Sequence, residues 1–491
     1  MKKKSSILLY ILGGIIVIAL IAIIIYVILN KAASPACNSP YMLAGNSCCL
    51  DQNDNGICDK DETTAPVSAS QNISSEAQEQ LNNLCISQYT NTENKDVFDS
   101  HVHITSKVSI SQIISEMDKA GVSISLLYSG SLEAISKYPD RFIAFVDTPD
   151  SPQPSTWLTQ GQSFVTSAEE QLKTGKYYGI GEANLRYYSG EITPPPTVYV
   201  PADTPLWLQL VDLSAKYRVP ISFHFVPDDA AANAAFERML NHNKDAIILW
   251  CHLGFNNLPL NSIILNDYLL RYPNLYFDTA GIQNMQNPLP QSNSNWALLA
   301  NQSNNGKLNE EWKQFFETWN SRILFGSDAG GGSNGLERWL NYVDDSVEGA
   351  TPNAIGHWKG LFSNLEYNAA RNILSSNSRA LFLKEQKLPY DYLVSSDDKC
   401  YHIFVSSSSS VSALTFNQNT GAVAFKIADS IGTAMSAAIT IPAALARGNF
   451  TAQIDGQNVQ ITEISNSAST IINLEYTGGI RTVVLSASTT A

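Results

Sequence analysis

The side chains that could do chemistry begin with two histidines, His101 and His103, near the end of an apolar run. Residues two apart on a β-strand point to the same face, so the two imidazoles should project together. Neighbouring imidazoles at a strand end form half of a metal site, and Zn²⁺ is the ion that they bind most often. A His-x-His pair alone is weak evidence, so the prediction depends on the polar residues that come later in the chain.

Four further polar side chains each close a short apolar run that is typical of a β-strand. They are Glu182, His224, His252 and Asp328. Buried carboxylates are rare without a partner or a metal. Of the seven histidines in the chain, His242, His357 and His402 lack such a position, and we expect no role for them in the site. We therefore predict that the histidine pair and these four residues converge on one metal site.

Eight strand-like runs alternate with helical segments between about residues 91 and 388, and they are the elements that must position this site. The expected strands are 97–104, 122–128, 142–148, 178–183, 220–225, 246–253, 275–279 and 323–327. The expected helices include 110–120, 205–217, 230–241, 310–319 and a closing helix at 365–383. Eight such units over about 300 residues predict an α/β fold, the (β/α)8 TIM barrel. The C-terminal ends of its strands would bring the six residues to one mouth.

This ordered set of residues resembles the amidohydrolase superfamily of metal-dependent hydrolases, and more narrowly its amidohydrolase-related branch (family 2). The stretch from Asn377 to Phe382 is similar to the Asn-x-x-Arg-Leu-Phe ending of that family. The resemblance implies one metal ion on His101, His103 and Asp328. It implies a second ion on His224 and His252, with a carboxylate or a modified lysine on the fourth strand between the two ions. Glu182 occupies the bridging position, and a single ion stays open as an alternative.

A divalent ion in such a site would lower the pKa of its water from about 15.7 to about 7. Asp328 would accept a proton from that water and deliver it to the leaving group. The expected activity is hydrolysis of an amide, ester or lactone bond in a small-molecule substrate. Two alternatives stay open: decarboxylation of an aromatic acid, which relatives carry out with the same ligands, and a non-catalytic surface protein with a structural metal. Zinc, iron and manganese all suit these ligands.

The residues around the ligands are less defined by the sequence. Asp99 could orient an imidazole or end a turn, and Asn184 stands where many relatives carry a histidine. The stretch Arg186 to Tyr188 could contact substrate or lie in a surface loop. Gly330 to Gly332 suggest a loop that approaches the mouth closely. The insertion 281–307, rich in Asn, Gln and Pro, is expected to form a rim over the site.

An uncharged apolar run of 23 residues, 7–29, follows three lysines at the start of the chain. As a helix it would reach roughly 34 Å, enough to span a bilayer core of about 30 Å. The lysines predict that residues 1–6 lie in the cytoplasm and that the rest lies outside, anchored to the cell membrane by a single span. The net charge of −14 argues against a nucleic-acid partner.

A cysteine-rich segment at 30–62 follows the predicted anchor. Its four cysteines, Cys37, Cys48, Cys49 and Cys58, favour two disulfides in an oxidising compartment. It also fits the twelve-residue calcium loop, with Gly56 at the sharp turn. The expected ligands are Asp51, Asn53, Asn55, the carbonyl of Ile57, Asp59 and Glu62. Calcium would have a structural role here, and the alternative is a disulfide-closed knuckle that needs no metal.

The composition changes on both sides of the predicted barrel. Residues 63–90 read as a flexible linker, since they begin with a stretch rich in Ser, Thr, Ala, Gln and Pro. Residues 395–491 carry few charges and alternate apolar with polar residues, which predicts a small antiparallel β-sandwich as an accessory domain. Hairpin turns are expected at 419–421, 455–456 and 478–479. This segment contains no catalytic constellation.

Three further cysteines lie in or beside the predicted barrel. Cys85 and Cys400 lie just before and just after it and could bridge its ends. Cys251 is left over and precedes His252 in an apolar run, so we expect a buried free thiol.

Overall fold

The structure is a computed structural model that describes residues 41–44, 47–50 and 96–490, apart from nine gaps. The gaps are 105–107, 129–131, 149–153, 189–194, 255–258, 283–298, 302–306, 331–353 and 398. The chain divides into two units, Met1–Asn72 and Ile73–Ala491. In the first unit, β1 (Tyr41–Ala44) and β2 (Ser47–Leu50) form an antiparallel pair.

Several predictions concern residues outside the described ranges. They are the membrane anchor at 7–29, the calcium ligands from Asp51 to Glu62 and the linker at 63–90. Among the helices that the structure describes, none combines the length and the apolar character needed to cross a membrane. The anchor, the calcium loop and the cellular location therefore stay predictions.

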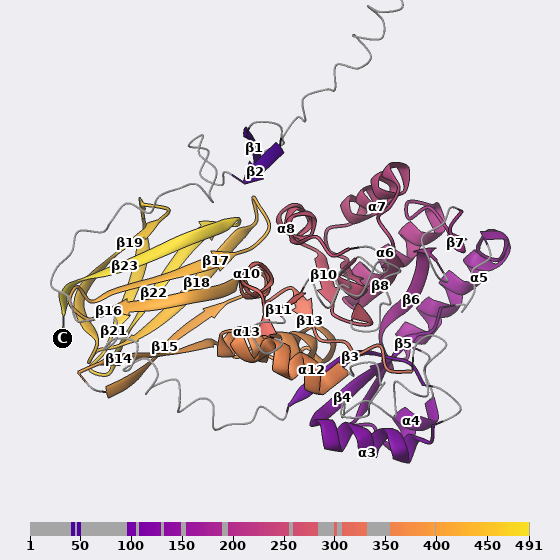
Figure 1. The fold of residues 1–491 in the computed structure, drawn as a ribbon, viewed down its shortest axis with the longest axis horizontal. Coiled ribbons are helices and arrows are strands. Elements are labelled where there is room, and N and C mark those ends of the chain that lie inside the picture. Colours follow the sequence, from indigo (N-terminus) through magenta and orange to yellow (C-terminus); the bar gives the residue numbers. More distant parts are fainter. Residues whose placement is uncertain are drawn as a thin grey trace, which may run out of the picture. The chain divides into compact units, whose positions relative to one another are not determined.

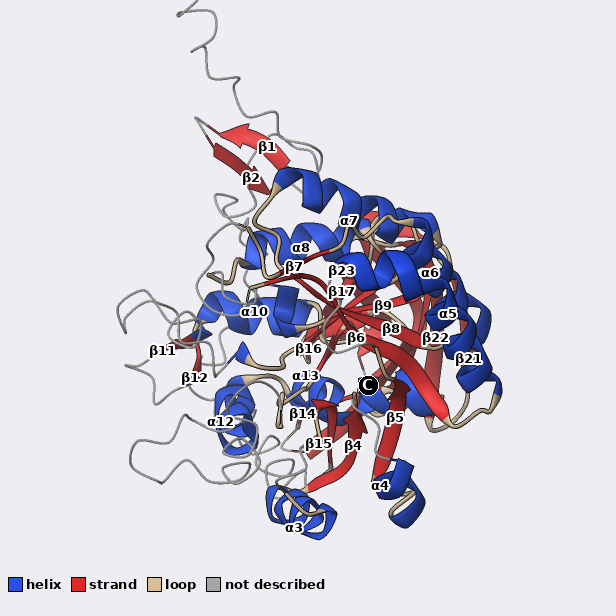
Figure 2. Cartoon of the chain, turned by 90° about the vertical axis from the view of Figure 1, so that its right-hand side faces the viewer, coloured by secondary structure: helices blue, strands red, loops and turns tan. Residues whose placement is uncertain are grey.

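Parallel strands surrounded by helices form the first part of the second unit (Figures 1 and 2). The strands are β3 (Val97–Val102), β4 (Val122–Leu127), β5 (Phe142–Val146), β6 (Tyr177–Tyr187), β8 (Pro220–Phe225), β9 (Ile247–Trp250), β10 (Leu275–Asp278) and β13 (Ile323–Leu324). They neighbour one another in the order β13-β10-β9-β8-β6-β5-β4-β3, and every neighbouring pair is parallel. β7 (Val198–Tyr199) pairs antiparallel with β6. All eight predicted strands are present, which confirms the nearly closed parallel barrel.

The first strand of the barrel meets the segment that follows the last one. The backbone N–H of Asp328 donates to the carbonyl of His101 over 2.8 Å. One step further on, the N–H of His103 donates to the carbonyl of Ala329 over 2.7 Å. These bonds join the two ends of the sheet and place three predicted ligands at the point where they join.

Helices cover the outside of the strands, as Figure 2 shows in blue. They are α3 (Ile110–Ala120), α4 (Leu132–Lys137), α5 (Pro154–Lys173), α6 (Pro205–Tyr217), α7 (Ala230–His242), α8 (Ser262–Arg271), α10 (Glu310–Thr318), α12 (Ala354–Leu361) and α13 (Tyr367–Arg371). Local signals set their ends: Ser109 and Gln112 form a capping box at the start of α3, and Gly121 ends it in the left-handed conformation. In the predicted closing helix, α13 continues into two π-helical turns, Asn372–Ser376 and Arg379–Leu383.

Two five-stranded antiparallel sheets follow the barrel and share one hydrophobic core, which confirms the predicted β-sandwich. The first sheet contains β14 (Tyr390–Ser396), β15 (Lys399–Ser407), β18 (Ala434–Pro442), β22 (Ser469–Thr477) and β21 (Ile461–Ser465). The second contains β16 (Ser410–Asn417), β17 (Ala422–Ala428), β23 (Ile480–Thr490), β19 (Ala446–Ile454) and β20 (Gln457–Val459). Cys400 on β15 is disulfide-bonded. Its predicted partner, Cys85, lies outside the described residues.

Two of the three predicted hairpins are confirmed. Residues 419–421 connect β16 to β17, and residues 455–456 connect β19 to β20, as antiparallel neighbours. The hairpin expected at Gly478 and Gly479 is wrong, because β22 and β23 belong to different sheets. The chain crosses between the two layers at this point. A Cβ atom on Gly478 would collide with the carbonyl of Ser430, so the crossing needs a glycine.

The sandwich contacts the barrel through segments that precede barrel strands. The N–H of Ser321, just before β13, donates to Ser410 Oγ over 3.0 Å. The N–H of Ile431 donates to the carbonyl of Leu270 at the end of α8, before β10, over 2.8 Å. These contacts therefore lie at the N-terminal ends of the strands, the end of a TIM barrel that serves stability rather than catalysis.

Candidate metal centre

The six predicted ligands meet at the C-terminal ends of the barrel strands. His101 lies in β3 with His103 just after it, Glu182 lies in β6, His224 lies in β8, His252 follows β9, and Asp328 follows β13. Each comes from a different strand except the first pair, so the barrel topology rather than sequence proximity brings them together. The structure thus places all six predicted residues in one cluster.

Glu182 lies between the two halves of this cluster. Its Oε2 atom is 3.4 Å from His101 Nε2 and 3.7 Å from His103 Nε2. Its Oε1 atom is 3.4 Å from His224 Nδ1 and 3.0 Å from His252 Nε2. One oxygen of the carboxylate therefore faces each pair of histidines.

Asp328 completes the half that contains the His-x-His pair. Its Oδ1 atom is 3.8 Å from His101 Nε2 and 3.6 Å from His103 Nε2. The two Nε2 atoms are themselves 3.2 Å apart. This spacing allows a hydrogen bond when one of the two nitrogens carries a proton, and it is also short enough for both nitrogens to contact one cation.

The backbone around Glu182 is fixed by close packing between β6 and β8. Gly181 has φ +133°, and a Cβ atom there would collide with Ser222 Oγ on the neighbouring strand. Thr148 Oγ1 donates a hydrogen bond to the carbonyl of Glu182. A glycine before the acid is therefore what allows the carboxylate to reach the centre of the cluster.

His252 and Asp328 adopt left-handed backbone conformations, with φ of +62° and +59°. Such angles are uncommon outside glycine, and where they occur the surrounding structure must hold them. Here the N–H of Asp328 donates to the carbonyl of His101, and the N–H of His252 donates to Asp278 Oδ1 over 2.8 Å. Backbone strain of this kind is typical of functional sites.

Glycine is also required at 281, the first residue of the predicted rim insertion. Gly281 has φ +67°, and a Cβ atom there would lie 2.9 Å from Asp328 Oδ2 and 3.0 Å from His252 Nδ1. The insertion therefore begins in contact with both halves of the cluster. Most of the remainder, and Gly331 and Gly332 of the second predicted loop, lie outside the described residues.

The charges of the cluster depend on one another. Burial opposes a proton on His101, but Asp278 and Glu182 outweigh it and raise the pKa of His101 well above its usual value. Burial would raise the pKa of Glu182, but His101 and hydrogen bonds from His224 and His252 hold it well below the usual range. Burial and the neighbouring His101 lower the pKa of His103. Glu182 thus stays ionised among the histidines.

The donor set fits a divalent metal. One potential ligand atom from each of His101, His103 and Asp328 lies within 4.8 Å of the other two. The same holds for His101, Glu182 and His252. In a tetrahedral zinc site with bonds of about 2.0–2.1 Å, neighbouring ligand atoms lie roughly 3.3–3.4 Å apart. The distances of 3.0–3.8 Å in this cluster are close to that value.

Sequence reasoning missed Asp278, the last residue of β10. It is fully buried, and its Oδ2 atom is 3.0 Å from His101 Nδ1. The signal was present, because the predicted strand 275–279 carries one acid in an otherwise apolar stretch. Asp99, the residue considered for orienting an imidazole, accepts hydrogen bonds at Oδ1 from the N–H groups of His101 and Ser327. It therefore ties β3 to the segment after β13.

The stretch after Glu182 is strand rather than surface loop. The ring of Tyr187 meets the ring of His224 edge-on, with centroids 4.9 Å apart. Arg186 is paired with Asp228: its Nε and Nη2 atoms donate to the two carboxylate oxygens over 2.5 and 3.0 Å. Tyr188 joins this pair, donating to Asp228 Oδ2 over 2.5 Å. Tyr187 is thus a residue of the site, whereas Arg186 and Tyr188 link the ends of β6 and β8.

The two other described histidine side chains lie elsewhere, as expected. His242, on α7, is 3.1 Å from Asp212, and His402, on β15, is 2.8 Å from Asp391. Asn184 lies on β6 and pairs in register with His224 of β8. Cys251 is a buried free thiol, which confirms that prediction.

Comparison with known proteins gives similarities among solved structures alone. No family model matches the chain, and no curated protein matches it. The solved structures include 2,6-dihydroxybenzoate decarboxylase from Rhizobium, with 13% identity and a TM-score of 0.33, covering 59% of this chain and 98% of that one. A putative amidohydrolase from Staphylococcus aureus has 14% identity and a TM-score of 0.32, covering 58% and 99%. Amidohydrolase 2 from Bifidobacterium longum subsp. infantis has 14% identity and a TM-score of 0.30, covering 59% and 99%. Two of these three solved structures are amidohydrolases by name.

Proposed function

We propose that the chain is a metal-dependent hydrolase of the amidohydrolase type that cleaves an amide, ester or lactone bond of a small molecule. The observation that carries this proposal is the position of Glu182. Its two oxygens face two separate pairs of histidine nitrogens at 3.0–3.7 Å. A carboxylate that served only to balance charge would not need to direct one oxygen at each pair of histidines.

The ligand atoms divide into two metal positions. His101, His103 and Asp328 would hold one divalent ion, and His224 and His252 would hold the other, with Glu182 shared between them. Zinc suits this mixture of imidazole and carboxylate. A divalent ion bound there supplies the positive charge that makes water a nucleophile near neutral pH and polarises the bond under attack.

The protein supplies the proton transfers and the walls of the site. Asp328 is the general base: its carboxylate lies at the edge of the cluster, 13% exposed, where it can accept a proton from water and return it to the leaving group. His101 is fully buried, whereas the side chain of His103 is 24% exposed, so substrate approaches from the His103 side. Tyr187 forms an aromatic wall beside His224.

Metal analysis of the purified ectodomain followed by a substrate screen tests this proposal. We expect up to two divalent ions per chain and turnover of at least one ester, lactone or amide, lost with a chelator and restored by Zn²⁺. Release of CO₂ from an aromatic acid such as 2,6-dihydroxybenzoate would instead show a decarboxylase that uses the same ligands. Bound metal without any turnover would indicate a binding protein.

For the cellular location, we infer a single membrane anchor at 7–29 with the barrel outside the cell. The three lysines before the apolar run support this orientation. A protease added to intact cells should degrade the barrel, and protection of the barrel would reverse the proposed topology.

A calcium site in the segment from Asp51 to Glu62 is part of the same proposal. Calorimetry on an oxidised peptide of residues 35–65, with Mg²⁺ as the control, tests it.

A further inference from the structure

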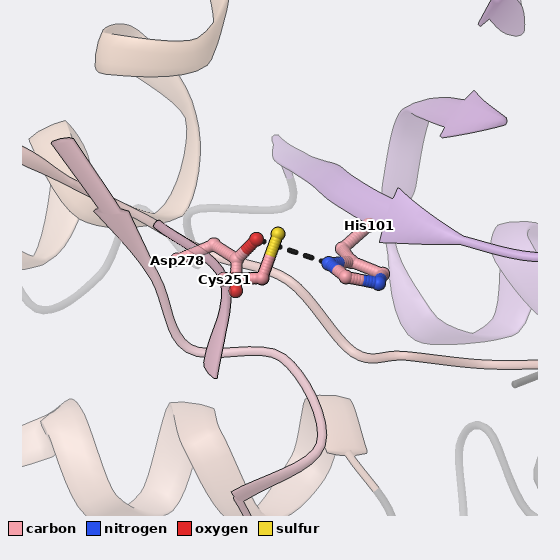
Figure 3. A group of neighbouring side chains, drawn as sticks. All are labelled: His101, Cys251 and Asp278. Carbon is pink, nitrogen blue, oxygen red and sulfur yellow. Dashed lines mark hydrogen bonds and ion pairs between the residues drawn. The ribbon is translucent and has the colours of Figure 1, made fainter. Parts of the chain in front are cut away.

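A second layer of polar side chains lies beneath the metal ligands, inside the barrel. Figure 3 shows His101 of β3 and Asp278 of β10, with the sulfur of Cys251, the residue after β9, beside the bond between them. His101 Nδ1 is 3.0 Å from Asp278 Oδ2, and both side chains are completely buried. The sulfur, the ring nitrogen and a carboxylate oxygen all lie within 4.8 Å of one another.

Asp278 is itself held in place by the backbone. Its Oδ1 atom accepts hydrogen bonds from the N–H of His252 over 2.8 Å and from the N–H of Ala280 over 3.1 Å. The carboxylate cannot rotate without breaking both bonds, so Oδ2 stays directed at His101. A carboxylate accepts and does not donate, so the Nδ1 atom of His101 must carry the proton that this contact requires.

The other nitrogen of His101 is then available for metal. Nε2 faces Glu182 Oε2 at 3.4 Å, His103 Nε2 at 3.2 Å and Asp328 Oδ1 at 3.8 Å. With the proton on Nδ1, His101 could offer its Nε2 lone pair to a cation that lies among these atoms. A partner carboxylate of this kind fixes the tautomer and the orientation of a histidine ligand.

Cys251 and Tyr128 close the remaining sides of the ring. Cys251 is 1% exposed and its side chain also interacts with that of His101, but a thiol is a weaker acceptor than a carboxylate. The ring of Tyr128 meets that of His101 edge-on, with centroids 4.4 Å apart.

We propose that Asp278 is a positioning residue that holds His101 in the Nδ1–H tautomer through their hydrogen bond. Cys251 lies beside that bond and is the weaker acceptor. This inference rests on the proposed function, because it assigns a role toward the metal of the same site. It adds a residue from β10 to a centre whose ligands come from β3, β6, β8 and the ends of β9 and β13.

Asp278→Asn tests the proposal with almost no change of shape. The amide can turn its NH₂ group toward Nδ1, which would favour the proton on Nε2 and block the lone pair. We expect Zn²⁺ affinity at one position to fall by about 10–100-fold, while the second ion stays bound. The measurement is titration of the metal-free protein with Zn²⁺ against a competing chelator, with thermal unfolding as a check on the fold.

Asp429→Asn is the matched control. Asp429 is also buried and accepts a hydrogen bond from a backbone N–H, that of Ser430, but it lies in the sandwich. This variant should keep wild-type affinity for both ions. Wild-type affinity in Asp278→Asn would overturn the positioning role, whereas a wild-type protein that binds no metal would overturn the proposed function instead.

Two further measurements need no charge-removing variant. In the Zn²⁺-loaded wild type, histidine-selective ¹⁵N spectra should place the proton of His101 on Nδ1, and a proton on Nε2 would overturn the proposal. In the Cd²⁺-loaded wild type, absorption from a thiolate–Cd²⁺ bond would show that Cys251 is a ligand, so that the inner layer binds metal rather than positions His101. Cys251→Ala should lower Zn²⁺ affinity less than Asp278→Asn.

Discussion

The two ends of the barrel both bury polar side chains, but they pair them differently. At the N-terminal end, where the sandwich docks, donors meet acceptors. Asn320 Nδ2 donates to the carbonyls of Glu317 and Val411 over 2.7 and 3.1 Å, and its Oδ1 accepts from Asn372 over 2.9 Å. Such groups lose little on burial, because each finds a partner within the protein.

At the mouth, histidine rings meet carboxylates and one another within 3.0–3.8 Å. The Nε2 atoms of His101 and His103 face each other at 3.2 Å, and the carboxylates of Glu182 and Asp328 lie within 3.8 Å of them. Buried ionisable groups are costly unless they are paired or coordinate a metal. The two ends therefore differ in kind: one pairs an amide side chain with backbone carbonyls, whereas the other gathers residues that could hold a metal ion.

Of the variants considered, Glu182→Gln should disrupt the residue cluster at the mouth of the barrel most severely. The amide keeps the shape but loses the charge and replaces one acceptor oxygen with a donor, so it cannot serve both pairs of histidines. We expect both ions to be lost and activity to fall to the background rate. Metal content and turnover measure the two effects, while thermal unfolding checks the fold. Retention of both ions would contradict the bridging role.

Asp328→Asn should separate proton transfer from metal binding. Asn retains a carbonyl oxygen that can face the ligand nitrogens, but it cannot accept the proton. We expect most of the metal to stay bound and turnover to fall by roughly 10²–10⁴-fold, the usual contribution of a general base. His101→Ala is the comparison variant, since it should lose metal together with activity. Wild-type turnover in Asp328→Asn would rule out Asp328 as the base.

The contrast also explains what the sequence could predict. Four of the six predicted ligands were recognisable because each closes an apolar run that is typical of a strand, and His101 and His103 were recognisable as a His-x-His pair. Asp278 had a similar position, but its partner, His101, is 177 residues away, and no local pattern indicates which acid faces which ring.

The N-terminal end could not be predicted at all. Its contacts join loop residues to the sandwich across large sequence separations, such as Ser321 with Ser410, 89 residues apart. Asn and Ser in loops have no periodicity, so only the folded chain shows which of them pair. The crossing at Gly478 and Gly479 was mistaken for a hairpin for a related reason, because a turn sequence does not reveal which sheet the next strand joins.

Arg322→Ala should destabilise the contacts at the N-terminal end of the barrel without changing metal binding at the mouth. Arg322 is 5% exposed; its Nε and Nη2 atoms donate to the carbonyls of Leu275 and Tyr272 over 2.8 and 2.7 Å, and Nη1 lies 3.4 Å from Asp429 of the sandwich. Removing one partner of a buried ion pair typically costs about 3–5 kcal/mol. We expect a loss of that order in the free energy of unfolding, measured with denaturant. Metal bound per folded chain should not change, and a large fall in metal would mean that the two ends are coupled.

The free energy of unfolding should also depend on pH through a group at the N-terminal end of the barrel, with a smaller effect than that of Arg322→Ala. Glu366, at the start of α13, accepts hydrogen bonds from the N–H of Ala413 over 2.7 Å and from the hydroxyl of Tyr392 over 3.3 Å, both in the sandwich. Its backbone N–H donates to Glu317 Oε1 over 3.0 Å, and Lys313 lies 3.1 Å from that second acid. Burial, together with the neighbouring charge of Glu317, raises the pKa of Glu366 to about 7.

The sign follows from the protons bound in each state. Between about pH 4.5 and 7 the folded protein holds a proton on Glu366 that the unfolded chain has lost, so its stabilising contribution is lost as the pH rises through this window. We expect a decrease on the order of 2–3 kcal/mol in the free energy of unfolding from this group, measured with denaturant at pH 5 and pH 8. Glu366→Gln stays uncharged and should remove that part of the decrease, because it keeps the neutral carbonyl beside Ala413. An identical pH profile in Glu366→Gln would mean that Glu366 already carries its charge in the folded protein.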